Sequence, residues 1–179
     1  MSWSKIFSAV LLFFSTFLSG QSNAGHINWG RGTVSVQGSI IDAACAISVD
    51  SRDQTIDVGI NSTGNLSRGQ EISKKLSIEL INCVLERPVQ NHHGWSHFQV
   101  TFDGDADGEL FGISGDAKGM AIQISDENGH IARPGEALPA ANITPGTMNL
   151  NYKIKLVANG QAIVPGDYFS AIRFKTDYF

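Results

Sequence analysis

The sequence predicts an all-β protein, an antiparallel sandwich of short strands, and three observations support this. Apolar residues recur at every second position in several stretches, instead of at the helical spacing. Glycine-rich turns separate these stretches, and Asn128-Gly129 and Asn159-Gly160 are strong hairpin dipeptides. No stretch has the length and caps of an ordinary amphipathic helix, although AAC and GDAKG could each hold a single helical turn. Many short strands joined by such turns are typical of a sandwich.

Each alternating stretch has one apolar face and one polar face, as expected for a strand that is half buried. The apolar faces are Leu76, Ile78 and Leu80; Phe98, Val100 and Phe102; Met120, Ile122 and Ile124; Leu150, Tyr152, Ile154 and Leu156; and Tyr168, Ile172, Phe174 and Tyr178.

The first 24 residues have the layout of a secretory signal peptide. Lys5 precedes an apolar run, and small residues at Ser22 and Ala24 predict cleavage after Ala24. The run is shorter than the roughly 20 residues that span a bilayer, and no later stretch approaches that length. We therefore expect an exported protein of one domain, residues 25–179, with no membrane span.

Charge and composition exclude some partners. The formal net charge of the whole sequence is −4, and loss of Lys5 makes it one unit more negative. The sequence contains no block of Lys or Arg that could follow a phosphate backbone, so we expect no nucleic-acid partner.

The two cysteines, Cys45 and Cys83, predict one disulfide if the protein is exported to an oxidising compartment. A reduced pair would need another explanation, such as a metal. The bridge would close a loop of about 38 residues, for which the chain-entropy estimate is about 4 kcal/mol.

The first and last alternating segments differ from the others. GTVSVQGSIIDAACAI, residues 32–47, alternates well but has only a polar, glycine-containing stub before it after cleavage, and the last strand runs to Phe179. We interpret the leading segment as a spare strand for a sandwich that lacks one. An open sheet edge pairs readily with another chain, and a donor and an acceptor in one chain predict head-to-tail growth.

These residues resemble the fimbrial subunits, or pilins, that Gram-negative bacteria assemble by the chaperone–usher route. The resemblance rests on GTVSVQGSIIDAACAI, on QTIDVG after it, on the second cysteine at the end of IELINC, and on the last strand with Tyr178. It implies an incomplete immunoglobulin-like sandwich that lacks its last strand. A periplasmic chaperone fills the groove until, at the outer-membrane usher, the extension of an adjacent subunit replaces it.

The resemblance also implies roles for individual residues. Residues 1–24 would be the signal peptide, 25–42 the donor-strand extension and 43–179 the pilin domain. Cys45 and Cys83 would form the family disulfide. The side chains facing a neighbour's groove would be Val34, Val36, Gly38, Ile40 and Asp42. The edge gripped by the chaperone would include Tyr168, Ile172, Phe174, Tyr178 and Phe179.

Within the family, VTFDG, GDAKGMAIQISDENGHIARPGEALPA and the segment from Tyr152 to Phe179 look most similar to the minor subunit that terminates and anchors the rod of P pili. A major rod subunit or an adapter pilin is the alternative. The expected location is the cell-surface fimbria, at its base.

Two stretches suggest metal sites, and we interpret both as solvated loops. Asp103, Asp105 and Asp107 match the start of a calcium-binding EF-hand loop, but the twelfth position is Ser114 instead of Glu, and strands flank the loop. His92, His93 and His97 lack the spacing of a helical metal site.

We expect no enzyme activity and no cofactor. The sequence has no GxSxG motif, and its acidic residues lie in turns instead of in pairs at strand ends. A secreted metal-dependent hydrolase is the remaining alternative and would need scattered groups to come together.

Overall fold

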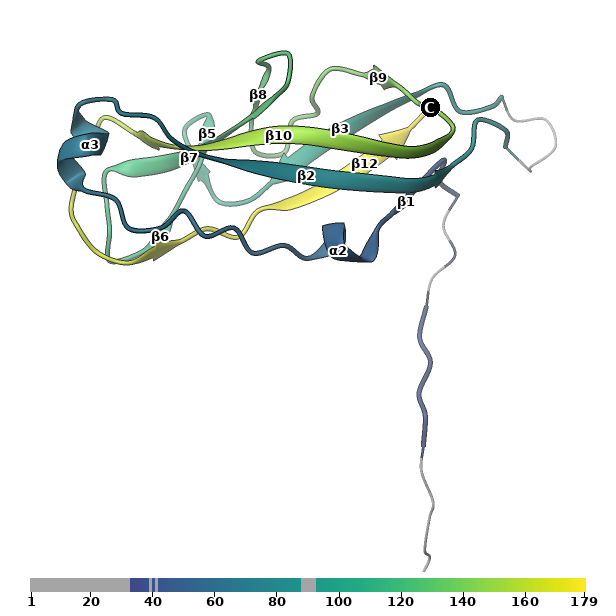
Figure 1. The fold of residues 1–179 in the computed structure, drawn as a ribbon, viewed down its shortest axis with the longest axis horizontal. Coiled ribbons are helices and arrows are strands. Elements are labelled where there is room, and N and C mark those ends of the chain that lie inside the picture. Colours follow the sequence, from purple (N-terminus) through teal and green to yellow (C-terminus); the bar gives the residue numbers. More distant parts are fainter. Residues whose placement is uncertain (1–32, 39, 41, 88–92) are drawn as a thin grey trace, which may run out of the picture. The chain divides into compact units, whose positions relative to one another are not determined.

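The computed structural model describes residues 33–38, 40, 42–87 and 93–179. Contacts divide the chain into two units, Met1–Ile40 and Ile41–Phe179, which we describe separately. In the first unit, residues 33–38 and Ile40 have no assigned strand or helix. The second unit is a sandwich of antiparallel strands (Figure 1).

One sheet of the sandwich is built on two long strands, β2 (Ile72–Cys83) and β10 (Gly146–Ala158), which pair along most of their length. β1 (Ala46–Ile47) pairs with the outer edge of β2. On the other side of β10 follow β7 (Met120–Asp126), β5 (Leu110–Phe111) and β4 (Ala106–Asp107), and β8 (Ile131–Ala132) also pairs with β7.

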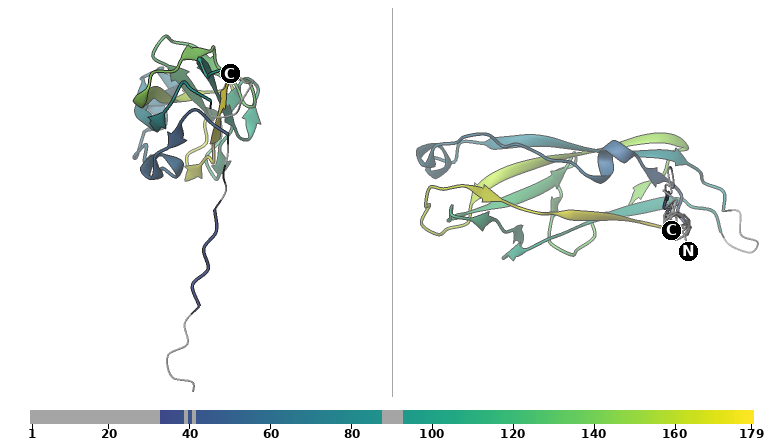
Figure 2. Two further views of the ribbon diagram at one scale, coloured as in Figure 1. Left: turned by 90° about the vertical axis from the view of Figure 1, so that its right-hand side faces the viewer. Right: turned by 90° about the horizontal axis from the view of Figure 1, so that it is seen from below.

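The second sheet has β3 (His97–Asp103) at its centre, between β12 (Arg173–Tyr178) and β9 (Ala141–Asn142). A separate short pair joins β6 (Ser114–Gly115) to β11 (Tyr168–Phe169) just before β12. Figure 2 shows the two layers edge-on, with β11 and β12 along one side of the unit.

The predicted alternation is confirmed on the long strands. The side chains of Ile78, Leu80, Phe102, Phe111 and Ile124 are the largest fully buried ones. Burial of a side chain of this size stabilises the fold by about 1.5 to 3 kcal/mol relative to exposure. Four of these residues lie on apolar faces predicted from the period of two, whereas Phe111, in the two-residue β5, was not predicted.

The suggested helical turns were wrong. AAC and GDAKG contain no helix, and the short helices lie at α2 (Val49–Arg52) and α3 (Thr63–Ser67). α3 forms because Ser62 caps it, its side chain accepting a hydrogen bond from the Asn65 amide at 3.2 Å. Within the residues that the structure describes, neither helix is long and apolar enough to cross a membrane.

Cys45 and Cys83 form the predicted disulfide, which is buried in the core. Cys83 reaches the core because β2 is irregular near its end. Asn82 has a left-handed φ of 55°, and the register with β10 shifts between Gly146 and Met148. Up to Leu80 the buried residues of β2 have even numbers. The irregularity shifts the alternation by one residue, so that Cys83 is buried instead of Asn82.

Candidate functional site: an open groove beside the last strand

An apolar groove of about 1170 Å³ lies within the second unit, between the segment from Ile47 to Leu66 and the segment from Pro165 to Phe174. Core side chains from four strands line its floor. These are Ile72 and Leu76 of β2, Phe102 of β3, Met120, Ile122 and Ile124 of β7, and Ile154 and Leu156 of β10.

The first wall follows β1 and is attached to β2. The Ser48 amide donates to the Glu79 carbonyl, and the Glu79 amide donates to the Ser51 hydroxyl, both at 2.9 Å. Further on, the Gln54 side chain donates to the Ser77 carbonyl at 3.0 Å. Residues 54–61 have no assigned strand and line the groove. The wall is therefore fixed at its start and continues as irregular chain.

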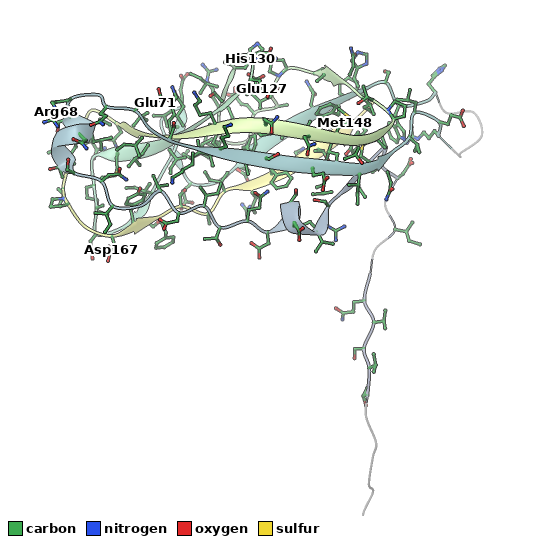
Figure 3. All side chains as sticks on the ribbon, in the orientation of Figure 1. Arg68, Glu71, Glu127, His130, Met148 and Asp167 are labelled. Carbon is green, nitrogen blue, oxygen red and sulfur yellow. A yellow bond between two sulfur atoms is a disulfide. The ribbon has the colours of Figure 1, made fainter. Side chains whose placement is uncertain are left out.

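The second wall contains β11 and β12. The Asp167 carbonyl accepts hydrogen bonds from the Asp116 and Ala117 amides at 2.9 and 3.1 Å, and Figure 3 labels Asp167 in the turn before β11. The Ser170 hydroxyl donates to the Gly112 carbonyl at 2.7 Å. These bonds hold the chain before β12 against the loop around β6.

β12 leaves one edge open. Among the residues that the structure describes, it pairs with β3 alone. Phe179 and His97 exchange two hydrogen bonds, of 3.0 and 2.9 Å, which sets the phase of the ladder. Because such pairs alternate along an antiparallel ladder, the amides and carbonyls of Phe174, Thr176 and Tyr178 face away from β3. They form a row of groups available to another strand.

The predicted groove-edge residues divide into two groups. Tyr168, Ile172 and Phe174 line the groove, and each is only partly buried although its side chain packs against the core. Tyr178 also faces the core, but it contacts Trp95 edge-on and lies 3.5 Å from the Cys45 carbonyl. The Phe179 main-chain oxygen accepts hydrogen bonds from the Ser96 and His97 amides, and its ring is exposed.

The Tyr168 hydroxyl is a polar group at the apolar groove. It is buried and has no hydrogen-bond partner among the described residues. Burial raises the pKa of Tyr168, and the negative charge of Asp57 on the opposite wall raises it further. This hydroxyl therefore stays protonated in the folded protein.

The predicted donor residues lie in both units. Val34, Val36 and Ile40 of the first unit have exposed side chains. Asp42 belongs to the second unit, where its carboxylate pairs with Arg87. The docking of these residues into a neighbouring groove remains a prediction.

The acidic loop and the histidines do not form a recognisable metal centre in the described ranges, which contain no cluster of three or more candidate ligands. The Asp107 carboxylate accepts a hydrogen bond from Asn159 at 2.6 Å, and Asp103 pairs with Arg173 at 3.2 Å. His97 lies 2.7 Å from the Ser96 hydroxyl and stacks on Phe179. His92 lies outside the described residues.

Sequence reasoning missed the first wall and did not identify which core residues form the floor. The apolar positions of β7 and β10 were predicted to be buried, but alternation does not show which of them line the groove. Ile56 and Val58 alternate in QTIDVG and were a usable signal for the wall, since both pack on the core beside the groove.

A sequence model of the family described as fimbrial protein matches residues 34–178. The chain belongs to the fimbrial protein family. Fimbrial proteins are structural subunits of surface fibres, so this pilin is a building block of a fimbria.

Curated relatives include two minor subunits and a major one. The PRS and PAP fimbrial minor pilin proteins of Escherichia coli are each 34% identical over 154 residues, covering 84% of this chain and 78% of the relative. The major MR/P fimbria protein of Proteus mirabilis is 35% identical over 155 residues, covering 83% of this chain and 85% of the relative.

Solved structures are similar as well. The P pilus rod subunit PapA has a TM-score of 0.68 and 26% identity, covering 76% of this chain and all of that one. A subunit of a chaperone–usher pilus has the same score and identity, covering 87% of this chain and all of that one. The sandwich of this pilin is thus the immunoglobulin-like fold of chaperone–usher pilins.

Proposed function

We propose that this pilin is a minor subunit of a chaperone–usher fimbria, joined to its neighbours by donor-strand exchange, and that it terminates or anchors the rod at the outer membrane. The observation that carries the exchange is the groove beside the open edge of β12. In this proposal residues 1–24 are a signal peptide, 25–42 the donor extension and 43–179 the accepting domain.

The groove offers both kinds of contact that a donated strand uses. Core side chains on its floor would contact the alternate apolar side chains of the donor, and the main-chain groups of Phe174, Thr176 and Tyr178 would pair with its backbone. Val34, Val36 and Ile40 are the larger apolar side chains of the proposed donor, and burial of each contributes about 1.5 to 3 kcal/mol. A linkage of this kind dissociates slowly.

The partners in this proposal follow from the resemblance. A periplasmic chaperone lends a strand to the groove, the outer-membrane usher hosts the exchange, and adjacent pilins supply and receive extensions. The function needs no catalytic residue, cofactor or nucleic acid. It places the pilin in a surface fimbria, at its base.

The observations on the position in the rod favour two different classes of subunit. The relatives described as minor pilins favour a terminating or anchoring subunit. The alternative, a rod or adapter subunit, is favoured by the major MR/P relative and by the groove itself, which has a volume of about 1170 Å³.

Deletion of residues 25–42 tests the donor role, because the domain keeps its groove but loses its extension. We expect the shortened pilin to bind chaperone and to be absent from rods. The matched control deletes residues 25–32 only, which leaves the proposed donor residues in place. Attachment of the longer deletion to rods at the level of the control would contradict the proposal.

A second experiment tests the position in the rod. Chaperone-bound pilin is mixed with a synthetic peptide of residues 33–43, and release of chaperone is followed. A terminating subunit refuses the peptide, whereas release would assign the pilin to the rod or adapter class.

A further inference from the structure

The root of the extension is held by an ion pair. The carboxylate of Asp42 accepts hydrogen bonds from two nitrogens of the Arg87 guanidinium, Nε at 2.9 Å and a terminal nitrogen as well. The Arg87 side chain is 23% exposed and the Asp42 side chain 47%, so this pair is less exposed than the other arginine–carboxylate pairs of the described residues, those of Arg133 and Arg173. Asp42 is close to the boundary at Ile40 between the two units.

The Arg87 guanidinium packs on the ring of Trp95. Its guanidinium carbon lies 4.1 Å from the centre of the Trp95 ring, within the range of a cation–π contact. Trp95 is buried and packs edge-on against Tyr178, with ring centres 6.0 Å apart. A series of side-chain contacts therefore connects the ion pair to Tyr178 at the end of β12.

The loop that carries Arg87 is closed by its own backbone. The Trp95 amide donates to the Leu85 carbonyl at 2.7 Å. A Cβ atom at Gly94 would come 2.5 Å from that carbonyl oxygen, so this closure requires glycine. The backbone at Leu85, two residues before Arg87, is thus bonded to the backbone at Trp95.

The chain after Asp42 is equally fixed. Ala44 is buried, its carbonyl accepts from the Val84 amide at 2.9 Å, and Cys45 is bonded to Cys83. The freedom of the extension to pivot therefore depends on the residues just before Ala44. In Figure 1 the end of β2, the start of β3 and the C-terminal end of β12 meet at this end of the domain.

We propose that Asp42, Arg87 and Trp95 form a joint that fixes the direction in which the extension leaves the domain. The purpose of this joint rests on the proposed function, donor-strand exchange. Once Val34 to Ile40 lie in a neighbour's groove, the angle between the two subunits depends on the short link that the joint holds. In this proposal Asp42 acts at the root of the extension on its own subunit, which departs from its predicted role as a donor side chain, and the residues from Val34 to Ile40 are the part that enters the neighbour.

The test measures the joint in the full chain, without any acceptor subunit. Nitroxide labels are placed at Ile40→Cys, before the joint, and at Lys75→Cys, on the exposed face of β2. Double electron–electron resonance then gives the distribution of distances between them. We expect a narrow distribution in the parent and one about twofold broader in Arg87→Ala, because the released link regains backbone freedom.

Further variants separate the joint from general stability. Asp42→Ala should broaden the distribution as much as Arg87→Ala does. Arg87→Lys keeps the charge but loses the planar stack on Trp95, and it should broaden the distribution less. Arg173→Ala removes another arginine–aspartate pair, with Asp103, that is remote from the extension, and it should leave the width unchanged. Thermal unfolding checks that each variant is folded.

The proposal is overturned if Arg87→Ala and the parent have equal widths, or if Arg173→Ala broadens the distribution as much as Arg87→Ala. The labelled chain is measured at a dilution at which size-exclusion chromatography shows a monomer, so these outcomes do not depend on donor-strand exchange between copies. Failure of the exchange itself appears separately, as attachment of the chain that lacks residues 25–42.

Discussion

Gly38 has open space around it in its own chain, because an added Cβ would meet no heavy atom within 4 Å. Any damage from a larger side chain at this position must therefore arise in a partner. In a donor strand, glycine lets the backbone pass a crowded place in the acceptor.

We predict that Gly38→Val leaves the thermal stability of the isolated pilin unchanged and strongly reduces its attachment to rods. Ser35→Val is the matched control, since the period of two places Ser35 on the opposite face from Gly38. The measurements are the unfolding temperature and the amount of pilin recovered with purified fimbriae. Equal attachment of the two variants would show that Gly38 does not face a neighbour's groove.

Tyr168 offers a second prediction at this scale. Its hydroxyl is buried without a partner in the described part of the chain, and an unsatisfied buried hydroxyl lowers stability. Tyr168→Phe removes that group and keeps the ring, so we expect the free energy of unfolding to rise by about 0.5 to 1 kcal/mol. Urea denaturation of the variant and the parent measures it. A fall in stability of similar size would mean that the hydroxyl has a partner in solution.

Single contacts of this kind could not be predicted from the sequence. Arg87 and Trp95 lie in ERPVQNHHGW, which has no periodic pattern, and Asp42 precedes them by more than forty positions. The contact between them depends on the disulfide and on the closure at Gly94, both of which are formed by the folded chain. The alternation of residues 34–40, by contrast, was visible in the sequence because it is local.

At the scale of elements, β12 combines two functions on alternate residues. Phe174 faces the groove and lies 6.3 Å, centre to centre, from Phe102, whereas Lys175 points to solvent. We therefore expect a groove residue to affect both the core and a donated strand, and its outward neighbour to affect neither strongly.

We predict that Phe174→Ala lowers the free energy of unfolding by about 2 kcal/mol, below the value for a fully buried phenylalanine because the groove leaves the ring partly exposed. It should also speed the dissociation of a bound donor strand. Lys175→Ala is the control. It should change the free energy of unfolding by less than about 0.5 kcal/mol and leave the dissociation rate of the donor strand nearly unchanged. Chemical denaturation and off-rates of a labelled donor peptide are the measurements. Equal effects of the two substitutions would contradict the proposed orientation of β12.

The long strands were predictable because burial imposes a period of two, as Ile78, Leu80, Phe98 and Phe102 show. Three features were not. The irregularity at Asn82 breaks the period to bring Cys83 into the core. α3 depends on a single cap at Ser62, and the short pair of β6 and β11 depends on backbone bonds to Asp167 that no residue pattern announces.

At the scale of the whole molecule, the groove and the open edge of β12 are two aspects of one missing strand. From its alternating first segment the sequence predicted a spare strand and a sandwich that lacks one. The open edge of β12 agrees with the second, and the spare strand stays a prediction. The sequence could not indicate the volume of the groove or the residues that line it, since these depend on the arrangement of β2, β7 and β10 in space.

Hydrogen exchange at β12 tests most directly whether another molecule completes this sandwich. A chain lacking residues 25–42 is refolded with and without a synthetic peptide of residues 33–43, which bypasses any barrier to exchange. We predict that the amides of Phe174, Thr176 and Tyr178 are unprotected without peptide, and that they exchange at least about a hundredfold more slowly with it. The amides of Lys175 and Asp177, which face β3, are the internal reference. Protection of Phe174, Thr176 and Tyr178 in a monomer without any added strand would contradict the account.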